Sequence, residues 1–142
     1  EIVWVLAHEI GHYKKKHTKQ MLVFSLIQTF VIFYLFSLFI SNLWIANALN
    51  SSHSSFHLWA IWFSILFSPI SLVLGIFGNI LSRKNEFEAD NYAKINYSGT
   101  SLISWLKKLS KNNLTNLKPH KVYEFVHYSH PTVLKRIERL EM

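Results

Sequence analysis

The chain has 142 residues, about the length of one domain, and its lack of cysteine excludes a disulfide framework and any thiolate metal site. Its formal net charge is +7, but no module of interleaved basic and aromatic residues accompanies it. We therefore expect no nucleic-acid partner. We assign the excess of positive charge to basic residues beside a membrane and on solvated helix faces. The stretch from Gln20 to Ser82 contains no Asp, Glu, Lys or Arg, which excludes an ordinary soluble domain.

Residues 1–19 predict one helix, which carries the H-E-x-x-H motif His8-Glu9-Ile10-Gly11-His12. Its two histidines are four residues apart, so they lie on one face of the helix and can bind one metal ion. Glu9 projects beside the same site, where it can take a proton from a metal-bound water. The alternative is a solvated helix that carries two histidines by chance. His17 lies off the ligand face of this helix, and we expect it to be a surface histidine.

Two apolar runs, residues 21–45 and 58–81, are each long enough to span a bilayer as a helix. Two buried core helices are the alternative, but the runs are too long and too uniformly apolar for so small a domain. Lysines precede the first run, Arg83 and Lys84 follow the second, and the loop from Ala46 to His57 has neither lysine nor arginine. The positive-inside rule then places both chain ends on the cytosolic side. Pro69, inside the second span, is expected to kink it.

Residues 82–142 predict a helical cytosolic part. The helical pattern continues to about Tyr97, and an amphipathic helix follows over residues 100–111. Its lysines are expected to face water, and its inward face is expected to hold Leu102, Ile103, Trp105, Leu106 and Leu109. After a loop, a short helix is expected over residues 122–126. A last helix should begin at Pro131, a favourable first position, and run to about Leu140.

A catalytic zinc ion needs three protein ligands and an open position. A third histidine on an extended motif is excluded, because Lys15 and Thr18 occupy the positions that such an extension uses. The other arrangement takes a glutamate from a second helix, and Glu86 fits it. Asp90, one turn later, would accept a hydrogen bond from the other ring nitrogen of a ligand histidine and fix its tautomer.

The helix that carries Glu86 has a small face, formed by Ala89 and Ala93, which allows close approach to the metal. A hairpin of two spans returns Glu86 to the membrane face that holds the histidine motif. The alternative is a solvated acidic helix start, and Glu88 is expected to be simply exposed.

The motif His8-Glu9-x-x-His12, two spans, and then Ser82-Arg83-x-x-Glu86-x-x-Ala89-Asp90 resemble those of the type I CAAX prenyl endopeptidases, integral-membrane zinc metallopeptidases of the gluzincin type. The run from His127 to Pro131, followed by Arg136, is also similar to theirs. The resemblance covers essentially the whole chain. It implies an all-α, multi-span membrane protein of the endoplasmic reticulum or inner nuclear membrane, with its motifs on the cytosolic side.

The resemblance further implies one zinc ion per chain and removal of the last three residues from prenylated CAAX proteins. His130 and Arg136 would lie at the active site, where either can stabilise the developing oxyanion. Without the resemblance, they would be an N-cap-like residue and a surface charge. The role of His127 stays open between substrate binding and packing.

The family is much longer, with further spans before the zinc helix. We therefore expect residues 1–142 to be the C-terminal fragment of a single peptidase domain. Two other functions stay open. One is a membrane quality-control metallopeptidase of the heat-shock type, and the other is a truncated, non-catalytic membrane-anchored fragment.

Overall fold

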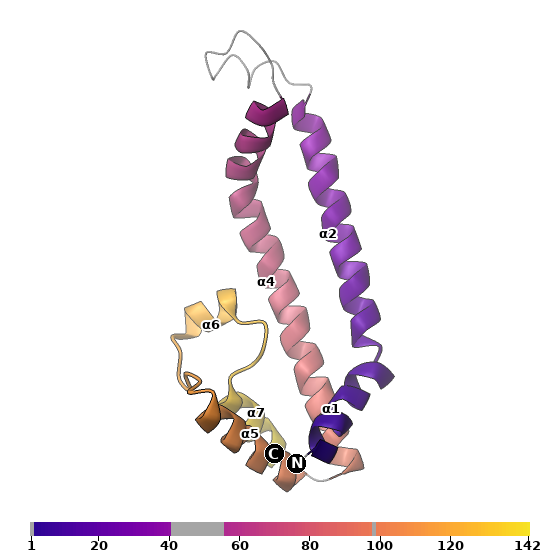
Figure 1. Cartoon of the computed structure of the whole chain (residues 1–142), viewed down its shortest axis with the longest axis vertical. Coiled ribbons are helices and arrows are strands. Elements are labelled where there is room, and N and C mark those ends of the chain that lie inside the picture. The colour runs from indigo at the N-terminus through magenta and orange to yellow at the C-terminus, as the bar shows by residue number, and fades with distance from the viewer. Residues whose placement is uncertain (1, 41–55, 98) are drawn as a thin grey trace. The chain divides into compact units, whose positions relative to one another are not determined.

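The computed structural model describes residues 2–40, 56–97 and 99–142, and all regular structure in these ranges is helical, as predicted (Figure 1). The helices are α1 (Ile2–Lys14), α2 (His17–Ile40), α4 (Phe56–Asn96), α5 (Gly99–Asn112), α6 (Lys121–His127) and α7 (Val133–Glu141). The chain divides into two compact units. One comprises Glu1–Leu22 with Gly75–Met142, and the other is Val23–Leu74.

The unit Val23–Leu74 contains most of the two apolar runs. The helical segments His17–Leu38 and Trp59–Asn96 are long and apolar enough to cross a membrane, which agrees with the two predicted spans. Within this unit α2 contacts α4 through aromatic side chains, because the Phe36 ring lies 4.9 Å from that of Phe63. Residues 41–55, with the end of the first predicted span and most of the loop, lie outside the described residues.

The prediction of one helix over residues 1–19 is wrong, because α1 ends at Lys14 and α2 begins at His17. Lys16 has a φ of 58°, in the left-handed region, and its amide donates to the carbonyl of Tyr13 at 3.1 Å. A left-handed residue at this point is a common way to end a helix. The residue here is lysine rather than glycine, so the end of α1 is not apparent from the sequence.

The core of the other unit lies between α5, α7 and the N-terminal helix. Leu102 and Leu106 of α5 are completely buried, as the amphipathic pattern predicted, and they pack with Ala7, Ala93, Ile137 and Leu140. The last helix begins at Val133 and not at Pro131. Its N-cap residue is Thr132, with φ −60° and ψ 150°, so the two residues before Val133 remain non-helical.

Helix α1 and the C-terminal part of α4 approach each other closely at Gly11. A Cβ atom built on Gly11 would lie 3.1 Å from both Cα and the carbonyl oxygen of Ala89. Ala89 and Ala93 are completely buried, so the small face predicted for this helix is confirmed. Only a residue without a Cβ atom allows this backbone contact, which brings the side chains of the two helices within reach of one another.

Candidate metal centre

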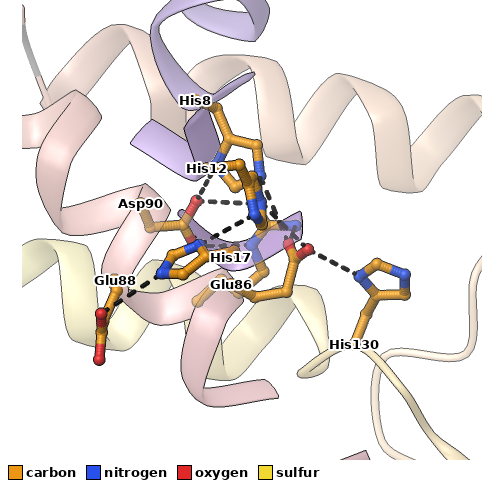
Figure 2. A network of polar contacts seen from close by, with 8 residues as sticks. His8, His12, His17, Glu86, Glu88, Asp90 and His130 are labelled. Atoms are coloured by element: carbon orange, nitrogen blue, oxygen red, sulfur yellow. Dashed lines mark hydrogen bonds and ion pairs between the residues drawn. The ribbon is translucent and has the colours of Figure 1, made fainter. Parts of the chain in front are cut away.

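Three predicted ligands, His8 and His12 from α1 and Glu86 from α4, point toward one another (Figure 2). The two Nε2 atoms of the histidines lie 3.1 Å apart. The His8 Nε2 atom lies 3.5 Å from Oε2 of Glu86, and the His12 Nε2 atom lies 3.5 Å from Oε1. One helix turn positions the two imidazoles, and the contact at Gly11 brings the carboxylate to them.

These separations fit a tetrahedral metal ion. Zinc bonds to histidine nitrogen and carboxylate oxygen are ~2.0–2.2 Å long, so neighbouring ligand atoms in a tetrahedral site lie about 3.3–3.5 Å apart. The nitrogen–nitrogen separation of 3.1 Å, and the separations of 3.5 Å from each nitrogen to a different oxygen of Glu86, lie close to this range. Two imidazole nitrogens and one carboxylate oxygen form a donor set suited to catalytic zinc, with the fourth position left for water or substrate.

Asp90 lies beside the ring of His8. Its Oδ1 atom is 3.0 Å from Nδ1 of His8, and its side chain is almost fully buried. Burial alone would lower the pKa of His8, but the carboxylates of Asp90 and Glu86 outweigh it and raise that pKa to about 9. A site whose carboxylates attract a proton so strongly also attracts a divalent cation.

Helix α7 and the segment before it contribute His130 and Arg136. Nδ1 of His130 lies 3.2 Å from Oε1 of Glu86, although most of the His130 side chain is exposed. The hydrogen bond with Glu86 raises the pKa of His130, although partial burial opposes the shift. The structure thus brings His130 beside Glu86 (Figure 2). Much of the His130 side chain is accessible to an incoming molecule.

Arg136 is buried and bonded to both carboxylates of the site. Its Nε and Nη2 atoms donate to Asp90 at 2.7 and 2.6 Å, and Nη1 lies 3.4 Å from Oε2 of Glu86. Burial disfavours the charged guanidinium, but Asp90 raises the pKa of Arg136 above its ordinary value. Arg136 was expected to help stabilise an oxyanion, and in the structure all three of its guanidinium nitrogens face carboxylates.

Two polar residues of α4 position the segment that leads to His130, a role that the sequence did not predict. Asn79 donates to the carbonyl of Val126 at 2.7 Å, and Arg83 donates to the carbonyls of Phe125 and Tyr128. These carbonyls lie at the C-terminal end of α6, where carbonyl groups have no N–H partner within the helix. In the sequence, Arg83 was noted as part of a motif and as a positive charge after the second span.

His17 is 2% exposed, so the expectation of a surface histidine is wrong. Its Nδ1 atom lies 3.1 Å from Nδ1 of His12, and its Nε2 atom lies 3.4 Å from Oε2 of Glu88. Glu88 was expected to be simply exposed, but it is only partly exposed and faces His17 (Figure 2). The break at Lys16 means that His17 does not continue the spiral of α1, on which the expectation was based.

The two remaining candidates lie on exposed surface. Glu9 is exposed beside the first ligand, so its carboxylate is open to water. His127 is also exposed, and its ring packs 4.7 Å from that of Tyr123.

The chain is similar to known proteases over its whole length. It is 36% identical to CAAX prenyl protease 1 homolog of Homo sapiens, over 99% of this chain and 30% of that protein. It is 33% identical to CAAX prenyl protease 1 of Saccharomyces cerevisiae, over 99% of this chain and 34% of that protein. The crystal structure of S. mikatae Ste24p matches with a TM-score of 0.89 and 32% identity, over 100% of this chain and 36% of that one.

The chain thus spans about a third of the length of the curated relatives that it matches. The model of Peptidase family M48 matches residues 1–142, and the chain therefore belongs to that family.

Proposed function

We propose that this chain forms the zinc-binding part of a membrane metalloendopeptidase that removes the last three residues of prenylated CAAX proteins. The observation that carries the proposal is the convergence of His8, His12 and the Glu86 carboxylate, with nitrogen–nitrogen and nitrogen–oxygen separations close to those of a tetrahedral site. Membership of a peptidase family and the names of the relatives support the reaction and the substrate class.

Zinc is the metal that we propose, held by His8, His12 and Glu86, because two imidazoles and a carboxylate with one open position form a common catalytic zinc site. When bound, the ion supplies Lewis acidity, which makes water a stronger nucleophile near neutral pH and polarises the scissile carbonyl. Asp90 holds the proton of His8 on Nδ1, so that Nε2 keeps its lone pair for the metal.

Glu9 serves as the general base in this proposal. Its exposed carboxylate takes a proton from the attacking water and later delivers it to the leaving amine. His130 acts in its doubly protonated form, in which Nδ1 donates to Glu86 and the N–H of Nε2 donates to the oxyanion that develops during attack. Arg136 is a positioning residue, since it orients Asp90 and Glu86 and is too enclosed to reach a substrate.

We also propose that α2 and α4 cross a membrane, with the metal centre on its cytosolic side. Their length and apolar composition support the spans. The basic residues that flank the apolar runs support the orientation by the positive-inside rule. A membrane of the endoplasmic reticulum or nucleus is the location proposed from the resemblance, and a prenyl group partitioning into the same bilayer would present the substrate to the site.

A cleavage assay tests the proposal. The full protein, purified in detergent, should contain one zinc ion per chain and release the terminal tripeptide from a farnesylated CAAX peptide. Glu9→Gln should keep its zinc and lose about 10²–10⁴-fold in kcat. Glu138→Gln, which changes an exposed glutamate of α7, is the matched control and should cleave normally.

Other outcomes would reject the proposal. Near-normal cleavage by the Glu9→Gln variant would reject the general-base role. Equal cleavage of the same peptide without its farnesyl group would favour a quality-control peptidase. Zinc binding without any cleavage would favour a non-catalytic fragment.

A further inference from the structure

His17 is a nearly inaccessible polar side chain that the proposed reaction does not use. It is 2% exposed, and a buried imidazole costs free energy unless its ring nitrogens have hydrogen-bond partners. Both nitrogens have one, because Nδ1 faces His12 at 3.1 Å and Nε2 faces Glu88 at 3.4 Å. These contacts connect a proposed metal ligand to a carboxylate through a second histidine (Figure 2).

We infer that His17 and Glu88 position the metal ligand His12, holding its proton on Nδ1 and its ring in the orientation that the metal requires. The inference rests on the proposed function, since it assumes that Nε2 of His12 binds a metal ion. It assigns to His17 and Glu88 the task that Asp90 performs for His8.

The proton positions follow from the geometry. Nε2 of His12 lies among the donor atoms of His8 and Glu86, so it must keep its lone pair, and the ring proton is on Nδ1. That N–H then donates to Nδ1 of His17, which must be unprotonated. The proton of His17 is consequently on Nε2, where it donates to the carboxylate of Glu88. Each ring carries one proton, and every donor faces an acceptor.

The two ligand histidines are supported differently. His8 faces the carboxylate of Asp90 directly, at 3.0 Å. His12 reaches the carboxylate of Glu88 only through the imidazole of His17, and Lys84 lies 3.8 Å from the other oxygen of Glu88. A carboxylate behind a metal-bound imidazole makes that ligand more basic and fixes its ring, and loss of such a partner typically weakens metal binding by about 10–100-fold.

A purely structural histidine would not need this arrangement. A side chain that only filled space between the helices could be replaced by an apolar residue without changing the metal ligands. Because His17 contacts His12, a substitution of His17 should instead alter the metal centre. Zinc affinity and the visible spectrum of cobalt bound in place of zinc both report on the ligand geometry.

The test compares His17→Ala, His17→Asn and Glu88→Gln in the full protein purified in detergent. Zinc affinity is measured by competition with a chromophoric chelator, and the cobalt-substituted spectrum is recorded. His17→Ala should weaken zinc binding about 10–100-fold and shift the cobalt bands. His17→Asn should recover most of the affinity, because its side-chain oxygen can accept from Nδ1 of His12. His120→Asn, at an exposed position on the loop before α6, is the matched control.

Glu88→Gln and the double variant separate this role from a folding defect. Glu88 is partly exposed, so its substitution leaves the buried side chains of the fold in place, and it should weaken zinc binding less than His17→Ala. If the two residues act in series, the double variant should bind zinc no more weakly than His17→Ala alone.

Two results would overturn the inference. Zinc affinity within twofold of the wild type in His17→Ala, with an unchanged cobalt spectrum, would overturn it and leave the proposed function intact. A wild-type protein that binds no zinc would overturn the proposed function, and this inference with it.

Discussion

The contact between α1 and α4 at Gly11 makes Gly11→Ala an informative substitution. Its new methyl group would lie 3.1 Å from Cα and from the carbonyl oxygen of Ala89, and 3.3 Å from Cβ of Tyr92. The Ala89 atoms belong to the backbone of a helix, so no side chain can swing away to make room. The helices must separate by a few tenths of an ångström to reach ordinary contact distances.

Two opposing terms set the effect on folding. Alanine stabilises a helix by about 0.5–1 kcal/mol relative to glycine, whereas an overpacked contact costs about 1–3 kcal/mol. The net effect is a loss of up to about 2.5 kcal/mol in the free energy of unfolding. The metal centre should respond more strongly, because the Nε2 atoms of His8 and His12 already lie 3.5 Å from Glu86. Further separation exceeds the ~0.2 Å tolerance of a zinc bond, so we expect zinc affinity to fall at least about tenfold.

Chelator competition on the purified variant measures this loss of affinity, and thermal unfolding measures the stability. Gly75→Ala is the matched control, since among the described residues nothing lies within 4 Å of a Cβ atom at that position, and its zinc affinity should be unchanged. If Gly11→Ala bound zinc as tightly as Gly75→Ala, the claim that helix separation sets the ligand geometry would be refuted.

Three further predictions concern the site and its support. Arg136→Met removes the partner of two buried carboxylates and should destabilise the protein by about 3–5 kcal/mol. Arg136→Lys should cost less, and equal chemical-denaturation midpoints for both variants and the wild type would contradict the positioning role. In the metal-free protein, the pKa of His8 is raised from 6.5 to about 9, so its protonated form is favoured in the folded state. This stabilisation is present below pH 6.5 and is lost as the pH rises toward 9. The melting temperature of chelator-treated protein should therefore fall across this window, and a flat profile would argue against carboxylates acting on His8. Leu106→Ala, at a completely buried position of α5, should cost about 2–5 kcal/mol in thermal or chemical unfolding, and a loss below 1 kcal/mol would show that the α5–α7 core is not packed as described.

The sequence by itself determined the features that depend on local spacing. The four-residue step from His8 to His12, and the equal step from Glu86 to Asp90, place each pair on one helix face whatever surrounds the helix. The apolar runs are long enough to predict two membrane helices without any knowledge of their neighbours. For the same reason, Leu102 and Leu106 were predicted to face inward from the pattern of α5 alone.

Only the tertiary structure decided what depends on contacts between distant segments. The left-handed residue Lys16 ends α1 without a glycine, so the burial of His17 could not be inferred from helical spacing. Arg136 is separated from Asp90 by 46 residues, and its bonds to two carboxylates exist only because α7 packs against the site. Periodicity states which face of a helix a side chain occupies, but which groups meet that face is set by long-range packing.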